Sequence, residues 1–124
     1  MALVLIVDDS PTQTHALRTS LEKHGYDIAT AVNGQDGVRK AQELHPDLIL
    51  MDVIMPHLNG FQATRELSKH PETAAIPVVM VTTKDEESDR VWGIRQGAVD
   101  YLVKPVSERE LLDTARAALE RRSA

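Results

Sequence analysis

Short apolar runs alternate along this chain with longer segments in which apolar residues recur every three or four positions. The runs are typical of strands buried on both faces, and the periodic segments are typical of amphipathic helices. The pattern predicts strands at about residues 3–7, 27–31, 47–51, 77–82 and 100–103, and helices at about residues 11–24, 35–45, 60–69, 86–96 and 107–121. This alternation, with its short connections, predicts an α/β fold with a parallel, doubly wound sheet and right-handed crossovers.

Residues with suitable positional preferences lie at the ends of the predicted helices. Ser10 can cap the first helix, with Pro11 at its first position. Ser107 and Glu110 form a capping-box pattern at the start of the last helix. The predicted boundaries therefore agree with the hydrophobic pattern.

Length and composition favour one domain over residues 1–124, with no effector domain. The chain has no cysteine, which excludes disulfides and thiol chemistry. Its net charge is −5 with dispersed basic residues, which argues against nucleic-acid binding. No apolar run is long enough to cross a bilayer, and the N-terminus lacks the features of a signal peptide. We therefore expect a cytoplasmic protein without membrane insertion.

Three acidic residues follow two of the predicted strands. Asp8 and Asp9 come directly after the first strand, and Asp52 comes directly after the third. In an open parallel sheet, ligands bind outside the carboxyl ends of the strands. Three carboxylates gathered there repel one another unless they share a cation, and oxygen ligands of this kind suit Mg²⁺. The acids therefore predict a magnesium site and phosphate chemistry.

The other strand ends carry groups that suit the same chemistry. Thr82 and Thr83 end the fourth strand, and Lys104 follows the fifth. Each of these residues alone is weak evidence for a site, since a strand-end aspartate is often an ordinary cap and a lone lysine is usually solvated. Together they indicate a site for phosphoryl transfer, in which a carboxylate can be the nucleophile. Asp52 is the candidate because it stands singly on a central strand.

This combination resembles the receiver domain of two-component response regulators, a CheY-like family, over the whole chain. The matching residues are Val7-Asp8-Asp9, Met51-Asp52, Met55-Pro56 with Gly60, Val81-Thr82, Gly97-Ala98 and Asp100-Tyr101-Leu102-Val103-Lys104-Pro105. The resemblance implies a (βα)5 fold with the flavodoxin-like strand order 2-1-3-4-5. It also implies a phosphoacceptor switch rather than an enzyme, one that assists its own phosphorylation and dephosphorylation.

The resemblance implies a role for each acid. Asp52 accepts a phosphoryl group from the phosphohistidine of a histidine kinase. Asp9 and Asp52 bind Mg²⁺ through their carboxylates and Ile54 through its backbone carbonyl, while Asp8 acts mainly through water.

It also implies roles for residues on the last two strands. Thr82 and Lys104 contact the phosphoryl oxygens, and Thr82 and Tyr101 form the switch, with Tyr101 rotating on activation. The Lys104-Pro105 peptide bond is expected to be cis.

Further stretches resemble single-domain regulators of the chemosensory system that controls type IV pili and twitching motility. They are Asp9-Ser10-Pro11-Thr12, Leu21-Glu22-Lys23-His24-Gly25, Asn59-Gly60-Phe61-Gln62-Ala63-Thr64-Arg65, Val81-Thr82-Thr83-Lys84-Asp85 and Val91-Trp92-Gly93-Ile94-Arg95-Gln96-Gly97-Ala98. The resemblance implies a chemotaxis-type histidine kinase as phosphodonor and a downstream protein as target. Signalling to the pilus machinery and acting as a phosphate sink for a sister regulator both remain open. We expect a monomer or a weak dimer.

The predicted helix 86–96 has an unusual sequence. We expect Val91, Ile94 and Ala98 to face the sheet and Trp92 to lie near the surface. Trp92, Arg95, Gln96 and Val103 then form an output surface with the last helix. The alternative is that Trp92 is a packing residue. Gly93 inside the helix costs on the order of 1 kcal/mol relative to alanine, which predicts a labile helix.

Two residues flank the path of a water molecule that would attack the phosphorylated aspartate. These are Ile54 and Lys84, each two positions after a site residue. We hypothesise that the apolar Ile54 cannot orient water, so that dephosphorylation is slow. The alternative is that these positions tolerate many residues.

Two other functions compete with this interpretation. A small magnesium-dependent phosphatase with an aspartate nucleophile needs two aspartates two positions apart, and Asp52-Val53-Ile54 lacks the second. A flavodoxin-type electron carrier needs a glycine-rich phosphate loop after the first strand, where this chain has no glycine.

Overall fold

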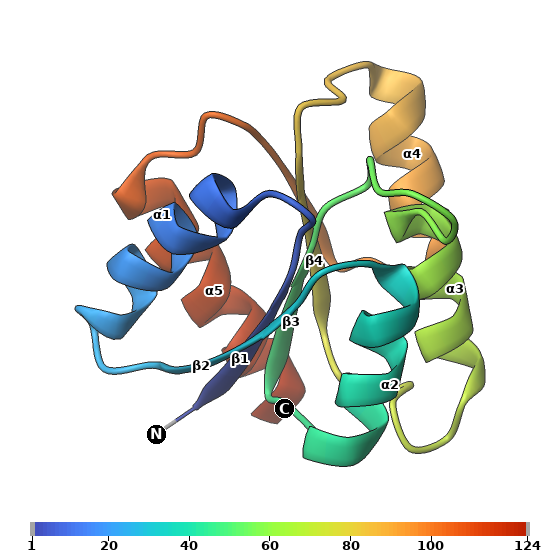
Figure 1. The fold of residues 1–124 in the computed structure, drawn as a ribbon, viewed down its shortest axis with the longest axis horizontal. Coiled ribbons are helices and arrows are strands. Elements are labelled where there is room, and N and C mark those ends of the chain that lie inside the picture. Colours follow the sequence, from blue (N-terminus) through green and yellow to red (C-terminus); the bar gives the residue numbers. More distant parts are fainter. Residues whose placement is uncertain (1, 124) are drawn as a thin grey trace.

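A computed structural model describes residues 2–123 and shows five parallel strands in one sheet, ordered β2-β1-β3-β4-β5 (Figure 1). The strands are β1 (Leu3–Val7), β2 (Asp27–Ala31), β3 (Leu48–Met51), β4 (Val78–Thr82) and β5 (Asp100–Val103). The helices are α1 (Pro11–Glu22), α2 (Gly34–Leu44), α3 (Gly60–Lys69), α4 (Glu87–Gln96) and α5 (Glu108–Ser123). The predicted fold class and strand order are confirmed.

The helices cover both faces of the sheet, α1 and α5 on one side and α2, α3 and α4 on the other (Figure 1). Alternate residues of β1 enter two different cores. Val4 and Ile6 pack with residues of α1 and α5, whereas Leu5 and Val7 pack with residues of α2 and α3. This explains why β1 is apolar at every position. No helix within residues 2–123 combines the length and the apolar character that a membrane span requires.

The register of the sheet places the ends of the strands together. Val7 of β1 pairs with Met51 of β3, so the acids that follow these strands emerge side by side. The backbone N–H of Asp52 donates to the Val7 carbonyl at 2.9 Å, and that of Lys104 donates to the Thr82 carbonyl at 2.8 Å. The edge that carries the site is therefore built from backbone pairing.

The expected caps are present. The Ser10 hydroxyl accepts from the backbone N–H of Gln13, and the Ser107 hydroxyl from that of Glu110. A capping box of Asn59 with Gln62, which was not predicted, begins α3. The peptide bond between Lys104 and Pro105 is cis, as predicted.

The expectation that Val91 and Ile94 face the sheet is wrong. Both side chains are exposed, and Gly93 is the buried residue of α4. A Cβ at Gly93 would lie 2.7 Å from the Met80 sulfur and 3.2 Å from the Tyr101 ring, so α4 sits close to the sheet at this point. Because the glycine occupies the inner face, the larger apolar residues are turned outward.

Gly60 lets α3 begin directly against the end of β3. A Cβ at this position would lie 2.0 Å from the Asp52 carbonyl oxygen and 2.8 Å from the Asp52 carbonyl carbon. Backbone atoms cannot yield as a flexible side chain does, so any larger residue displaces α3 or the segment that holds Asp52.

We expect Gly60→Ala to lower the free energy of unfolding by about 2 kcal/mol, because of this overlap with backbone. Urea unfolding followed by circular dichroism measures the change. The control is Arg65→Ala, an exposed position of the same helix, where the change should stay within about 0.5 kcal/mol. Equal effects at the two positions would contradict the close approach.

Candidate functional site

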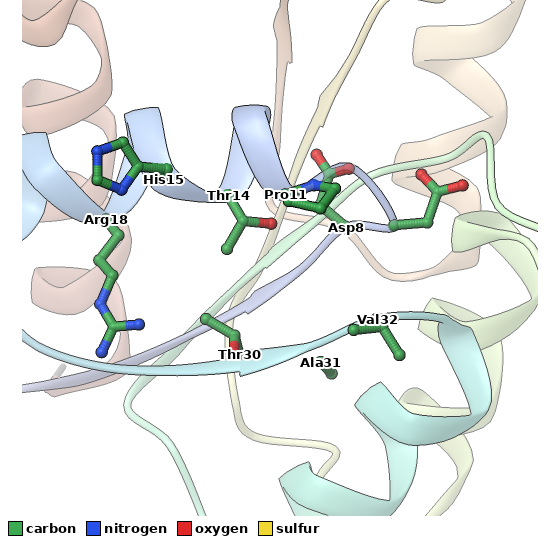
Figure 2. A pocket seen from close by; sticks show the side chains of 9 residues that line it. Asp8, Pro11, Thr14, His15, Arg18, Thr30, Ala31 and Val32 are labelled. Carbon is green, nitrogen blue, oxygen red and sulfur yellow. The ribbon is translucent and has the colours of Figure 1, made fainter.

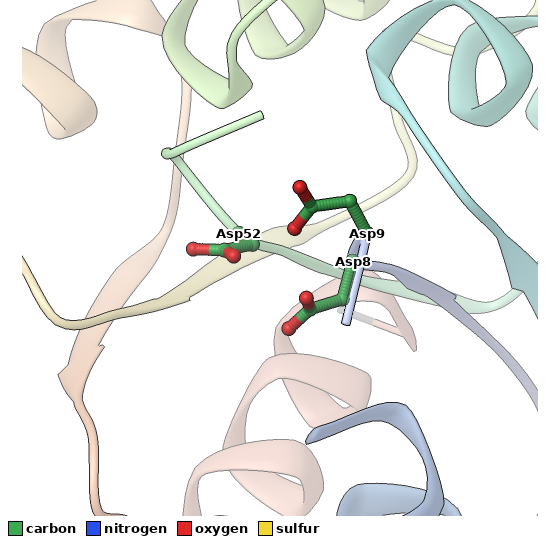
Figure 3. A group of neighbouring side chains, drawn as sticks. All are labelled: Asp8, Asp9 and Asp52. Atoms are coloured by element: carbon green, nitrogen blue, oxygen red, sulfur yellow. The ribbon is translucent and has the colours of Figure 1, made fainter. Parts of the chain in front are cut away.

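Three carboxylates meet at the edge formed by the ends of β1 and β3 (Figure 3). Each of Asp8, Asp9 and Asp52 offers a carboxylate oxygen, and these atoms all lie within 4.8 Å of one another. Asp8 and Asp52 are buried, with 3% and 8% of their surface exposed, whereas Asp9 is exposed. The cluster predicted from the strand ends therefore forms, open to solvent on the Asp9 side.

Lys104 supplies the positive charge of the site. Its ammonium group lies 2.8 Å from Asp8 Oδ2 and 3.6 Å from Asp52 Oδ2, and its side chain is only 9% exposed. Lys104 follows β5, so its side chain spans the ends of β4 and β3 to reach β1. One lysine thus links two carboxylates that would otherwise repel each other.

Asp52 sits in an environment that disfavours its charge. Burial raises the pKa of its carboxyl group, Lys104 lowers that pKa, and the negative charge of Asp8 raises it again; the net direction is upward. The backbone N–H of Val53 donates to Asp52 Oδ1 at 2.8 Å, and a bond from the Ile54 backbone also favours the carboxylate. A carboxyl perturbed by burial and by specific charges at a sheet edge is typical of a functional site.

Thr82 ends β4 as a fully buried residue, whereas Thr83 is exposed. The Thr82 hydroxyl accepts from the backbone N–H of Lys84 at 3.3 Å. This bond ties Thr82 to the loop that joins β4 to α4.

Tyr101 is 2% exposed and donates its hydroxyl to the Lys84 carbonyl at 2.8 Å. The Arg90 guanidinium lies 5.4 Å from the centre of the ring and donates to the Tyr101 carbonyl at 3.2 Å. Burial is the main cause that raises the pKa of Tyr101 to about 12, with Asp89 adding to it. Thr82 and Tyr101, the two predicted switch residues, thus bind the same loop residue.

No sequence motif marks the residues that hold Tyr101. Arg90 lies eleven residues away in the chain and belongs to no motif, so only the fold brings it to the ring. A glycine inside a helix is a usable sequence signal of close packing. At Gly93 that packing is against the Tyr101 ring, which was not predicted.

The predicted output residues do not form one continuous patch. Trp92 and Arg95 are exposed, and Gln96 and Val103 are half-buried. The Arg90 side chain contacts β5 through its hydrogen bond to the Tyr101 carbonyl. Each residue advances an α-helix by about 100°, so Trp92 lies about 200° from Arg90 around the helix axis. Trp92 therefore lies on the flank of α4 that faces away from Val103.

A cavity of about 330 Å³ opens beside the acids, between α1 and β2. Its lining includes Asp8, Asp9, Arg18, Thr30 and Val32 (Figure 2). No sequence pattern indicates this cavity. The cavity gives solvent and small solutes access to the exposed side of the acidic cluster.

A model of the response regulator receiver domain family matches residues 4–116. The chain belongs to the response regulator receiver family. It is 60% identical to PilH of Pseudomonas aeruginosa over 119 residues, which cover 96% of this chain and 98% of that protein. It is 40% identical to the regulator PhoP of Bacillus subtilis over 95% of this chain, but spans only 48% of that protein.

Solved receivers share the fold. The chemotaxis protein CheY4 of Vibrio cholerae superposes with a TM-score of 0.90 at 33% identity, over 95% of this chain and 98% of that one. The receiver of a sensor histidine kinase from Pseudomonas aeruginosa superposes with a TM-score of 0.89 at 29% identity, over 96% of this chain and 98% of that one. That receiver holds a magnesium ion in its active-site cleft. Receiver domains typically bind Mg²⁺, and the oxygen donors of Asp8, Asp9 and Asp52 fit such an ion.

We expect Asp52→Asn to raise the free energy of unfolding by about 1 kcal/mol at pH 7 in EDTA. Since the folded-state pKa of Asp52 lies above its ordinary value of 3.8, the carboxyl group destabilises the fold increasingly as pH rises through that window. The gain should therefore shrink as pH falls from neutrality toward 3.8, and it should be absent below that value. Urea unfolding across pH measures it.

Asp113→Asn is the matched control for this titration, because Asp113 is an exposed acid on α5. It should show no comparable gain at pH 7. A wild type more stable than Asp52→Asn at pH 7 without metal would contradict the raised pKa.

Proposed function

We propose that this chain is a phosphoacceptor switch in which Asp52 accepts a phosphoryl group from a histidine kinase. The observation that carries the proposal is the buried arrangement of Asp52 with Lys104 and two further acids at the carboxyl edge of the sheet. A deprotonated oxygen of Asp52 attacks the phosphorus atom, and the bond from phosphorus to the histidine nitrogen breaks. The nitrogen keeps the electron pair, and the phosphoryl group becomes an acyl phosphate on Asp52.

The surrounding residues balance the charge of the transferred group. Asp8, Asp9, Asp52 and the Ile54 backbone carbonyl would hold Mg²⁺, which would supply positive charge to the phosphoryl oxygens. Lys104 already lies between Asp8 and Asp52, so a small movement of its ammonium group brings it to a phosphoryl oxygen. Thr82 offers a hydroxyl from the neighbouring strand. Phosphoryl transfer depends largely on positioning and charge stabilisation of this kind.

The switch works through the loop after β4. A phosphoryl oxygen on Asp52 accepts a hydrogen bond from the Thr82 hydroxyl and draws it toward Asp52, which alters the bond that the same hydroxyl accepts from the Lys84 backbone. Tyr101 donates to the carbonyl of the same Lys84, so a change at Thr82 alters the support of the tyrosine. Phosphorylation then shifts the population between two arrangements of this loop and α4, and partners that prefer one arrangement read the change.

The cellular role follows from the likeness to PilH. That protein is matched over nearly its full length, which supports a stand-alone receiver over residues 1–124. We propose a role in type IV pilus and twitching-motility control, in the cytoplasm, with a chemotaxis-type histidine kinase as phosphodonor and a downstream protein as target. Acting as a phosphate sink for a sister regulator is the alternative output.

A phosphatase with an aspartate nucleophile is the weaker alternative. Such enzymes use a second acid two positions after the nucleophile, and that position is Ile54, whose apolar side chain is 56% exposed at the mouth of the site. The geometry therefore favours retention of the phosphoryl group over rapid hydrolysis.

We expect wild type to gain one phosphoryl group when incubated with Mg²⁺ and acetyl phosphate, and Asp52→Asn to gain none. Intact mass spectrometry measures the adduct. EDTA should abolish the reaction, and Lys104→Met should reduce its rate about a hundredfold, since it removes the buried ammonium group beside Asp52. An adduct of equal size on Asp52→Asn would refute Asp52 as the acceptor.

We expect Ile54→Asn to shorten the lifetime of phosphorylated Asp52 about tenfold or more, because an amide can orient the attacking water and an isoleucine cannot. Decay of the adduct after removal of the donor measures the lifetime. Leu44→Asn, an exposed leucine on α2 away from the site, is the control and should leave the lifetime unchanged. An unchanged lifetime in Ile54→Asn would show that this position tolerates either residue.

A further inference from the structure

The cavity between α1 and β2 is not used by the proposed phosphoacceptor chemistry. Its volume of about 330 Å³ lies within the range of small-molecule sites. Pro11, Thr14 and Arg18 line it from one face of α1, because they are spaced three and four residues apart. Thr30 of β2 lies opposite (Figure 2). Since Thr14 and Thr30 are short side chains, the space between helix and strand stays open.

The two ends of the cavity carry opposite charges. Figure 2 shows the Arg18 side chain at one end and Asp8 at the other. Asp9 lies beside Asp8, since carboxylate oxygens of the two residues are within 4.8 Å of each other. Pro11, next to the acids, and Arg18 are seven residues apart, so α1 separates the two ends by roughly 10 Å. A ligand that reaches both ends is therefore elongated.

Both terminal charges are available to a ligand. Asp9 is exposed, and within residues 2–123 its carboxylate has no ion pair or hydrogen bond, whereas Asp8 is paired with Lys104. Arg18 Nε lies 3.4 Å from Glu22 Oε1, but both side chains are about half exposed, and such a pair contributes little to stability. In the described part of the chain, the two terminal nitrogens of the Arg18 guanidinium have no partner.

We propose that this cavity binds a small zwitterion whose ammonium and carboxylate groups are separated by several methylene groups. The ammonium group pairs with Asp9, and the carboxylate pairs with the two terminal nitrogens of Arg18. Pro11 and Val32 supply apolar surface for the methylene groups.

Charge complementarity selects this class of ligand. A dicarboxylate would place a negative charge against Asp9, and a diamine would place a positive charge against Arg18. Glycine carries its ammonium and carboxylate groups on one carbon atom, which holds them too close together to reach both ends. The ligand therefore needs both charges and the chain between them.

Binding at this site also opposes the metal. Asp9 is one of the acids that would hold Mg²⁺, so the ammonium group and the ion compete for its carboxylate. The competition is reciprocal, because the factor by which Mg²⁺ weakens the ligand equals the factor by which the ligand weakens Mg²⁺. Such a ligand would slow phosphorylation of Asp52. That consequence rests on the proposed function, whereas the binding itself does not.

Titration of the protein with 6-aminohexanoate in EDTA, followed by ¹H–¹⁵N NMR, tests the binding. We expect saturable shifts concentrated in residues 11–18 and 30–32, with a dissociation constant on the order of 1 mM. Hexylamine and hexanoate each lack one charged end and should bind at least about tenfold more weakly. Lack of saturation up to about 50 mM, or equal binding of either single-ended molecule, would overturn the proposal.

Variants at the two ends test the assignment of the charges. Arg18→Gln should weaken 6-aminohexanoate about tenfold and leave hexylamine unaffected, whereas Asp9→Asn should weaken both. The matched control is Arg109→Gln, since Arg109 is 93% exposed on α5 and also pairs with an acid four residues later. It should leave the dissociation constant unchanged to within about twofold. Equal effects of Arg18→Gln and Arg109→Gln would overturn the proposal.

Magnesium separates this inference from the proposed function. At matched ionic strength, about 10 mM Mg²⁺ should raise the apparent dissociation constant of 6-aminohexanoate at least about twofold. An unchanged value would overturn the pairing of the ammonium group with Asp9. Failure of 6-aminohexanoate to bind while acetyl phosphate still modifies Asp52 would overturn this inference alone. Normal binding without any adduct on Asp52 would overturn the proposed function alone.

Discussion

The ion pair between Lys104 and Asp8 holds together the edge of the sheet on which the site depends. Asp8 and Asp52 are buried side by side, and two buried negative charges without a cation would be strongly unfavourable. Lys104 lies 2.8 Å from the first and 3.6 Å from the second. Because Lys104 follows β5 while the acids follow β1 and β3, the strand order brings the three groups together.

The buried acidic site lowers the stability of a fold whose core is otherwise apolar. Buried side chains on both faces of the sheet stabilise the molecule, whereas burial of the Asp52 carboxyl group raises its pKa and opposes folding at neutral pH. A carboxylate that is poorly solvated and close to one ammonium group is poised to gain from a cation or a phosphoryl group. The binding function and the energetic cost therefore have the same origin.

Close approach at Gly93 connects the site to the surface of α4. The glycine allows the helix to rest on Met80 and on the Tyr101 ring, and Tyr101 in turn bonds the loop that also holds Thr82. The same glycine forces Val91 and Ile94 outward. One residue without a side chain thus sets both the packing around Tyr101 and the apolar surface that the helix presents.

The sequence by itself determined the fold class, the strand order through its family likeness, and the positions of Asp8, Asp9 and Asp52. These follow from local periodicity and from the rule that parallel strands end at one edge, so each can be read from neighbouring residues. Only the tertiary structure decided which face of α4 is buried, and that Arg90 lies over Tyr101 while Lys104 bonds Asp8. Those outcomes depend on how closely segments that are distant in the sequence approach one another. At Gly93 the approach is possible because the residue has no side chain, and a hydrophobic pattern does not indicate such a contact.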